Sequence, residues 1–430
     1  MGLIILFLII SLLIYKSRNY DTISKRILLI YTAFWGMVIV LASIGIYDYD
    51  KPSSRTLIMM VVHVFAFIIG FSLIRISKYN FNNFSLESLD VKLQKLTSNK
   101  IFIGIISLLT LYVISLVLRF FSLLGTMNMS ELRTDFYESG IYGSLFAAIN
   151  GPILSPINLL LIPIFSWMCL KRRNWFCLIQ AIYLLGYASL GGGRFGYLRI
   201  LLGIIFVVFC LYLNAKNKRK RIIQLLVSLT IFIVMIGVTT TLRMSDYVDS
   251  KDGIKGVAKV TTEAVISYAV APITAFDYAL TNGYINRIGG YKYGALTGSA
   301  PELFIYIILN KMGVKYEKAL DSLVEIKQDE YINIGDGKYW NALYTSLLFY
   351  YLDFGWFGIF FFPFLFGMIT RWIIKKLFQT NSICIYIILT FIFHEIIRAV
   401  TDFTFVGVYT FIFMSILLVI GSQKIHFKSF

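Results

Sequence analysis

Residues 101–124 read IFIGIISLLTLYVISLVLRFFSLL, an apolar run whose one charged residue is Arg119. A helix that crosses a bilayer needs roughly 20 mostly apolar residues, with about 17 to 25 tolerated. This run is therefore predicted to be a transmembrane helix. Comparable segments occur at 1–15, 27–47, 57–76, 151–170, 174–190, 197–213, 222–242, 342–370, 382–397 and 404–422.

The composition agrees with a membrane protein. Hydrophobic residues make up 58% of the 430 residues and charged residues only 15%. A soluble core of ordinary size cannot hide that much apolar surface, so lipid must cover part of it. We expect an all-α polytopic membrane protein with about 11 transmembrane helices.

The charges predict how the chain is oriented. If the N-terminus lies outside, the cytoplasmic connectors hold 22 of the 40 Lys and Arg residues but only Asp21, Glu87 and Asp90 of the 23 acids. An excess of Lys and Arg in short loops marks the cytoplasmic side of membrane proteins. With an odd number of helices, the C-terminus would lie on the opposite side from the N-terminus, in the cytoplasm.

The same distribution restricts the possible functions. Basic clusters such as Lys171–Arg173 and Lys216–Arg221 lie at the ends of apolar segments, as topology signals do. The net charge of +17 therefore does not indicate nucleic-acid binding. All four cysteines fall near cytoplasmic helix ends, where thiols stay reduced, so neither a disulfide nor a cysteine metal site is predicted. Residues 1–15 lack the features of a cleaved signal peptide and are expected to remain as a first helix.

The chain divides into three parts: membrane helices over 1–242, a large external loop over 243–341, and membrane helices over 342–430. A loop of this length is expected to have structure of its own. Within it, Ser299 and Glu302 flank Pro301 and match a capping box that would begin a helix. The amphipathic stretch 257–280 is predicted to lie on the outer membrane surface or dip into it.

Several ionisable residues lie within or beside the apolar segments. Placing such a group in lipid costs free energy, so its side chain is expected to face protein or water. At about 1.5 Å of rise per residue, most of them fall near the outer membrane surface. Arg199 lies deeper, and Arg194 follows the glycines of the turn Gly191–Gly193. The residues at the outer rim are Arg119, Arg243, Asp353, His394, Glu395 and Arg398.

Two interpretations of these arginines remain open. The functional one is an anionic site for a lipid-linked phosphate, because guanidinium binds phosphate oxygens in bidentate fashion and glycine turns expose N–H groups to anions. The structural one is that long basic side chains extend to the interface and that glycines close a tight hairpin. We favour the anionic site for the set as a whole.

Other polar residues have similar alternatives. Glu395, Arg398 and Asp402 follow a helical spacing, which suits either an ion-pair ladder or a site that holds a sugar hydroxyl or a phosphate-binding arginine. His63 is interpreted as a packing residue. The acids of the turn Asp48–Asp50 could hold a metal, but chance explains such a turn better, and no metal or other cofactor is predicted.

Two segments resemble a known family. Asn341–Thr345 with Tyr350–Gly358, and the Gly-Gly-Gly-Arg turn at 191–194, are similar to segments of Wzy-type O-antigen and capsule polymerases of bacteria. The order of helices and the late external loop agree with that family over almost the whole chain, whereas the motifs cover about a tenth of it. O-antigen ligases of similar layout use a histidine in the large loop, and residues 243–341 contain none.

The resemblance implies a metal-independent glycosyltransferase of GT-C-like architecture in the bacterial inner membrane. It would join oligosaccharide repeat units carried on undecaprenyl pyrophosphate, at the outer face, into a surface polysaccharide. Its partners would be these lipid-linked oligosaccharides, membrane lipid and a co-polymerase that regulates chain length. Arg194 matches the family's important loop arginine, with Arg243 and Arg287 as weaker matches; Arg287 precedes Gly298 at a spacing known from some members.

These considerations define a candidate site. Asp353 is the first choice for the catalytic base, Glu395 the second, and Arg194 completes the catalytic set. The predicted pyrophosphate-binding residues are Arg119, Arg194, Arg199, Arg243 and Arg398. The predicted sugar-binding residues are Asn341, Tyr344 and Tyr350. The alternative functions are a flippase for lipid-linked oligosaccharide, in which the arginines would line a path, and an assembly partner without catalysis.

Overall fold

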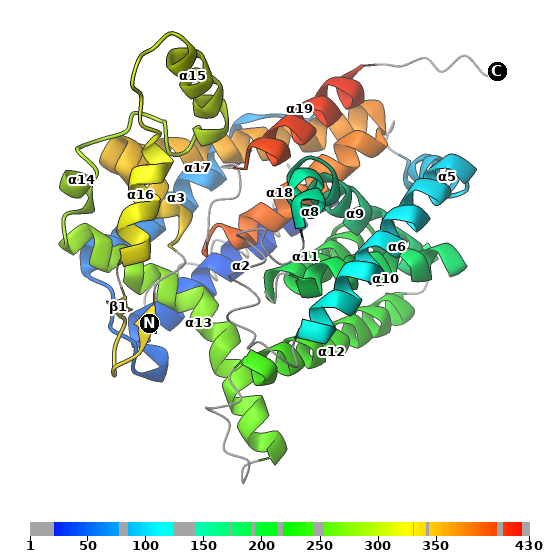
Figure 1. Cartoon of the computed structure of the whole chain (residues 1–430), viewed down its shortest axis with the longest axis horizontal. Coiled ribbons are helices and arrows are strands. Elements are labelled where there is room, and N and C mark those ends of the chain that lie inside the picture. Colours follow the sequence, from blue (N-terminus) through cyan, green and yellow to red (C-terminus); the bar gives the residue numbers. More distant parts are fainter. Residues whose placement is uncertain are drawn as a thin grey trace. The chain divides into compact units, whose positions relative to one another are not determined.

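The computed structural model describes residues 21–76, 85–123, 143–171, 174–190, 194–212, 218–243, 253–329, 331–340, 344–401 and 407–423. Over these residues the protein is mostly helical (Figure 1). The predicted first helix at 1–15, the glycines 191–193, Asn341 and Asp402 lie outside the described residues.

Five of the described helices are long and apolar enough to cross a membrane: Thr22–Ile44, Ser54–Leu73, Lys100–Leu123, Gly143–Lys171 and Ser346–Thr380. Shorter apolar helices accompany them, among them Trp175–Leu190 and Val408–Ser422. These helices confirm the all-α class and indicate a membrane-embedded protein. The total of about 11 spans stays a prediction.

The described residues form two compact units, each assembled from separate parts of the chain. Unit 1 comprises residues up to Phe81, Val265–Phe378 and Glu395–Ile416; unit 2 comprises Asn82–Ala264, Gln379–His394 and Leu417 onward. The compact units are a different division from the membrane and loop segments expected from the sequence.

Unit 1 contains the first two described apolar helices and most of residues 243–341, the predicted external loop. In the view of Figure 1, α14, α15 and α16 are drawn on the left, as are α3 and α17. Its elements are α2 (Thr22–Ile44), η1 (Ile46–Asp48), α3 (Ser54–Leu73), the C-terminal half of α13 (Gly253–Thr281), α14 (Tyr284–Arg287), α15 (Ser299–Lys311), α16 (Ala319–Asp329), β1 (Ile332–Asn333), β2 (Tyr339–Trp340), most of α17 (Ser346–Thr380), the end of α18 (Ile383–Arg398) and most of α19 (Val408–Ser422).

Local signals begin and end the first of these helices. Asp21 caps α2 by accepting the Ser24 backbone N–H at 2.8 Å, and Gly45 ends it in the left-handed conformation at φ 66°. Ser53 caps α3 in the same way. Gly70 and Gly367 let α3 and α17 approach closely: a Cβ on either residue would overlap the other helix's backbone, at Phe364 and Phe67 respectively.

Unit 2 is a bundle of apolar helices with an amphipathic helix, α5. Its elements are α5 (Leu86–Thr97), α6 (Lys100–Leu123), α8 (Gly143–Ile149), η2 (Asn150–Leu154), α9 (Ser155–Lys171), α10 (Trp175–Leu190), α11 (Arg194–Ile205), η3 (Phe206–Tyr212), α12 (Lys218–Arg243), and parts of α13, α18 and α19. Asp90 of α5 accepts a hydrogen bond from the Trp167 indole at 2.7 Å and pairs with Lys171 at 2.8 Å. These contacts hold α5 against the end of α9.

Two expectations about the external loop need correction. The predicted capping box is wrong, because Gly298 occupies the N-cap of α15 and Ser299 is its first helical residue. Glu302 instead accepts the Ala319 N–H at 2.9 Å, at the start of α16, and the Tyr316 hydroxyl at 2.8 Å. Partial burial, followed by the hydrogen bond to Glu302, raises the pKa of Tyr316 to about 12, so the phenol keeps the proton that it donates.

The second correction concerns α13. The stretch predicted at 257–280 is helical, with Pro272 inside it. The apolar side chains of its C-terminal half, including Val270, Ile273 and Phe276, are buried in unit 1 and do not form an exposed face for a membrane surface. Asp277 of the same half accepts hydrogen bonds from Ser53 and Thr56 at the start of α3.

The turn at residues 46–50 also packs against residues 331–340. Strands β1 and β2 form an antiparallel hairpin with Ile332 opposite Trp340. Ile334 accepts the Asp50 backbone N–H at 2.8 Å, and Lys338 donates to the Tyr47 carbonyl at 2.8 Å. Gly335 has φ 117° and lies so close to the Asp48 carbonyl that no side chain would fit there. The acidic turn at 48–50 therefore has a structural partner.

Candidate functional site

The most distinctive local feature of unit 1 is a break in α17. Phe354 and Gly355 leave helical geometry, and Gly355 adopts φ 59° and ψ −138°, a conformation that side-chain-bearing residues rarely adopt. This break lies within the segment Tyr350–Gly358, on which the predicted resemblance to a family rests. The sequence predicted one continuous helix there, because glycines in a long apolar run do not by themselves reveal a break.

The external loop is attached at this break. Lys292 and Tyr293 donate their backbone N–H groups to the Leu352 and Asp353 carbonyls, at 3.0 and 3.1 Å. These bonds use carbonyl groups that the break in the helix leaves available. Residues 292–293 of the loop therefore lie directly on the interrupted turn of α17.

Asp353 strengthens this attachment with its side chain. The residue is fully buried. One carboxylate oxygen accepts the Leu296 N–H at 3.0 Å, and the other accepts the Thr297 N–H at 2.8 Å and the Thr297 hydroxyl at 2.6 Å. A carboxylate with both oxygens occupied by donors is poorly placed to take a proton from a substrate. Its contacts favour a positioning role, and its assignment as the base stays a prediction.

Glu395, the second carboxylate of the predicted set, lies in the last turn of α18 and is buried in unit 1 near Tyr350. Arg398, one turn further on, is half-buried and ends the helix. Its carbonyl accepts hydrogen bonds from the Thr401 N–H and hydroxyl, at 2.7 and 2.9 Å. The predicted carboxylate and arginine thus share one helix end, as their spacing indicated.

The two predicted sugar-binding tyrosines that the structure describes are both buried. Tyr344 hydrogen-bonds the Tyr284 hydroxyl at 2.9 Å. The Tyr350 ring stacks on Phe362 at 5.2 Å and faces His63 at 6.1 Å. His63 also packs on Trp35 at 4.5 Å, so it lies in an aromatic core, which agrees with its interpretation as a packing residue. Neither tyrosine offers an open ring face to a sugar.

The other predicted arginines are spread over both units. Arg119 is exposed on α6 and Arg199 is half-buried on α11, both in unit 2. Arg194 is the first residue of α11 and Arg243 the last of α12, but their side chains lie outside the described residues. Arg287 lies over the Tyr284 ring at 5.2 Å in unit 1. A single anionic site that gathers these side chains stays a prediction.

The structure adds residues that the sequence did not single out. Arg55 donates to the Tyr351 hydroxyl at 2.6 Å, and its guanidinium lies 5.5 Å from the centre of that ring. Tyr291, which is half exposed, lies against Gly355 and beside Tyr351. Partial burial, followed by the neighbouring Tyr351 phenol, raises the pKa of Tyr291, so this hydroxyl stays neutral.

Comparison of the chain with family models, curated proteins and solved structures found no match.

Among the residues that the structure describes, no group of three or more His, Cys, Asp or Glu side chains could hold a metal ion. Of the predicted site residues, Tyr350 and Asp353 lie at or just before the break in α17, and Glu395 and Arg398 lie at the end of α18.

Proposed function

We propose that this protein is an oligosaccharide repeat-unit polymerase, a glycosyltransferase that acts on undecaprenyl-pyrophosphate-linked substrates at the outer face of the bacterial inner membrane. The observation that carries the proposal is the family-like segment Tyr350–Gly358, whose interrupted turn holds the external loop through five hydrogen bonds. Such an attachment would keep a site at a membrane surface in a fixed geometry.

The chemistry accounts for the residue types. An acceptor hydroxyl attacks the anomeric carbon of the donor sugar, the bond from that carbon to the pyrophosphate oxygen breaks, and undecaprenyl pyrophosphate leaves. The acceptor proton passes to a carboxylate, for which we favour Glu395 because both oxygens of Asp353 are occupied. Arginines at the membrane surface stabilise the charge that develops on the leaving group.

The proposal is tested with purified protein in lipid nanodiscs. A synthetic undecaprenyl-pyrophosphate oligosaccharide is added with a chelator present, and the products are separated by gel electrophoresis. A ladder of products spaced by one repeat unit supports the polymerase. If no ladder forms and reconstituted vesicles instead move the substrate across the bilayer, the protein is a flippase.

The Arg194→Ala variant extends this test. We expect it to lose chain growth entirely while its expression and thermal stability stay at the wild-type level, because a pyrophosphate leaving group would lose its counter-charge. Arg194→Lys serves as a control that keeps the charge but loses bidentate binding. Wild-type ladders from Arg194→Ala would remove this arginine from the mechanism.

A further inference from the structure

Four side chains form a patch on unit 1 that no predicted role explains: Arg55, Tyr291, Tyr293 and Tyr351, referred to below as the aromatic patch. Tyr293 is 77% exposed and Tyr291 43% exposed. Arg55 is also exposed and uses one of its donors on the Tyr351 hydroxyl. These residues come from the start of α3, the external loop and the first half of α17.

Tyr293 has fixed contacts although its ring is exposed. The Tyr293 backbone is hydrogen-bonded to Asp353, and its ring meets Phe354 edge-on at 6.2 Å. Gly294, at φ 93°, turns the chain directly after Tyr293, with Phe354 next to it. Rings that are fixed before binding lose little conformational entropy when a ligand arrives, which is the property of a binding surface.

The positions of the rings favour a water-soluble ligand over lipid. Exposed apolar rings suited to acyl chains, such as Trp356, Phe357 and Phe360, follow the break in α17. The aromatic patch lies before the break and on the external loop, and it carries hydroxyl groups and a guanidinium. Tyrosine faces with hydrogen-bond donors between them match the alternating C–H faces and hydroxyl edges of a pyranose.

We propose that the aromatic patch binds a saccharide chain, with a pyranose stacked on Tyr293 and Arg55 donating hydrogen bonds to sugar oxygens. The proposal rests on the proposed function, in which the patch would hold the acceptor or growing glycan beside the break in α17. Recognition of the glycan would then belong to residues outside the catalytic set, because none of the four patch residues is a carboxylate or a predicted pyrophosphate-binding residue.

The test measures glycan binding without any lipid carrier. Full-length protein in nanodiscs is applied to immobilised maltohexaose, chitohexaose and hyaluronan hexasaccharide, which present neutral, N-acetylated and uronate sugars. We expect wild-type protein to bind at least one of them, with affinity about tenfold weaker in Tyr293→Ala and in Arg55→Gln. Tyr293→Phe should restore binding, since it keeps the ring, and Tyr331→Ala, at a tyrosine that is 70% exposed elsewhere on the loop, should bind like wild type.

Each outcome bears on the proposal. No binding of wild-type protein to any of the three saccharides, or equal binding by Tyr293→Ala and wild type, would overturn it. Equal weakening by Tyr331→Ala would also do so, because the effect would then belong to exposed tyrosines in general. If the patch binds glycan but no product ladders form, the polymerase proposal is wrong and the glycan-binding proposal stands. If product ladders form and Tyr293→Ala and Arg55→Gln leave their length unchanged, the polymerase proposal stands and the proposed role of the patch is wrong.

Discussion

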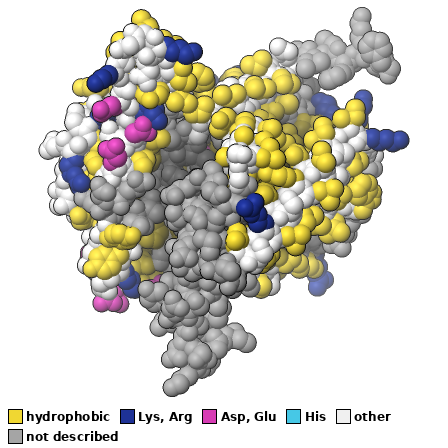
Figure 2. Space-filling model, in the orientation of Figure 1, with side chains coloured by type: hydrophobic (Ala, Val, Ile, Leu, Met, Phe, Trp, Pro, Cys, Tyr) yellow, Lys and Arg dark blue, Asp and Glu magenta, His cyan; other side chains and the backbone are white. Residues whose placement is uncertain are grey.

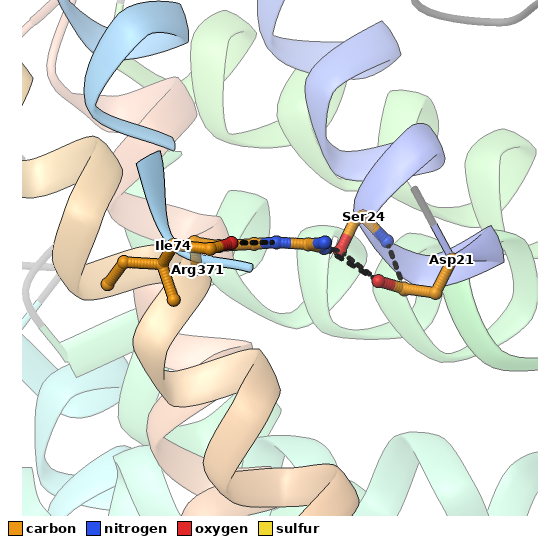
Figure 3. A network of polar contacts seen from close by, with 4 residues as sticks. All are labelled: Asp21, Ser24, Ile74 and Arg371. Atoms are coloured by element: carbon orange, nitrogen blue, oxygen red, sulfur yellow. Dashed lines mark hydrogen bonds and ion pairs between the residues drawn. The ribbon is translucent and has the colours of Figure 1, made fainter. Parts of the chain in front are cut away.

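Arg371 shows at the residue scale how a charge within an apolar helix is accommodated. Its side chain is 1% exposed, pairs with Asp21 at 2.6 Å, and donates to the Ile74 carbonyl at 3.2 Å and to the Ser24 hydroxyl (Figure 3). Three segments far apart in sequence, the N-terminus of α2, the end of α3 and the C-terminal third of α17, thus meet at one guanidinium.

We therefore expect Arg371→Ala to destabilise unit 1 by about 3–5 kcal/mol, since removing one partner leaves the Asp21 carboxylate buried and uncompensated. Thermal unfolding in detergent, followed by size-exclusion chromatography, measures the loss. The matched control is Lys171→Ala, which breaks the more exposed pair with Asp90 and should cost about 0–1 kcal/mol. Equal effects of the two variants would contradict the expected dependence on burial.

A second residue-scale prediction separates the two carboxylates. Glu395→Gln should abolish product ladders and leave thermal stability nearly unchanged, because a base is lost but the shape is kept. Asp353→Asn should instead lower stability by about 1–3 kcal/mol, because its amide group would face backbone donors where a carboxylate oxygen now accepts them. Ladders from Glu395→Gln at the wild-type rate would exclude Glu395 as the base.

At the scale of elements, the packing of α3 on α17 depends on two glycines. Gly70 and Gly367 bring the backbones of the two helices together, as small residues do between membrane helices. Gly355 has a different role, because its backbone conformation permits the break in α17 where the loop is attached. One helix, α17, thus contains a packing glycine and a conformational glycine in the same apolar context.

Alanine at either packing glycine should force the helices apart. We expect Gly70→Ala and Gly367→Ala each to destabilise the protein by about 1–3 kcal/mol through overpacking, measured by thermal unfolding in detergent. Gly104→Ala in α6 is the matched control, because a Cβ there meets no atom within 4 Å. That substitution should be neutral or stabilising by up to about 1 kcal/mol, as expected for glycine in a helix interior. A stable Gly367→Ala would show that the helices can move apart without cost.

At the scale of the whole molecule, acidic and apolar side chains gather over different elements. The Asp and Glu side chains visible in Figure 2 gather over α16 and the hairpin of unit 1. The surface over α6 and α12 in the same view is largely hydrophobic, with scattered Lys and Arg. Helix α16 and the hairpin belong to residues 243–341, the segment that the sequence predicts to lie outside.

The predicted orientation can be checked by cysteine labelling. With the four natural cysteines replaced by alanine, Asp336→Cys in the hairpin should react with a membrane-impermeant maleimide in intact cells, since positive residues keep their side of the membrane cytoplasmic. Lys95→Cys on α5 should react only after the membrane is permeabilised. Labelling of Lys95→Cys from outside would reverse the orientation.

The helices were predictable from the sequence because their signal is local. An apolar run such as 101–124 must satisfy its own backbone hydrogen bonds in lipid, and a helix does so without a partner. The same holds for caps such as Asp21 and Gly45. The shared helix end of Glu395 and Arg398 also follows from counting residues along a helix.

The contacts between distant segments were decided only by the tertiary structure. The break at Gly355, the partners of Asp353 at Leu296 and Thr297, and the burial of Tyr344 and Tyr350 depend on residues brought together from separate segments of unit 1. Hydrophobicity along the chain determines which segments enter the membrane, because transfer to lipid depends on each segment alone. Which side chains then face one another depends on how those helices pack, and that is a property of many segments at once.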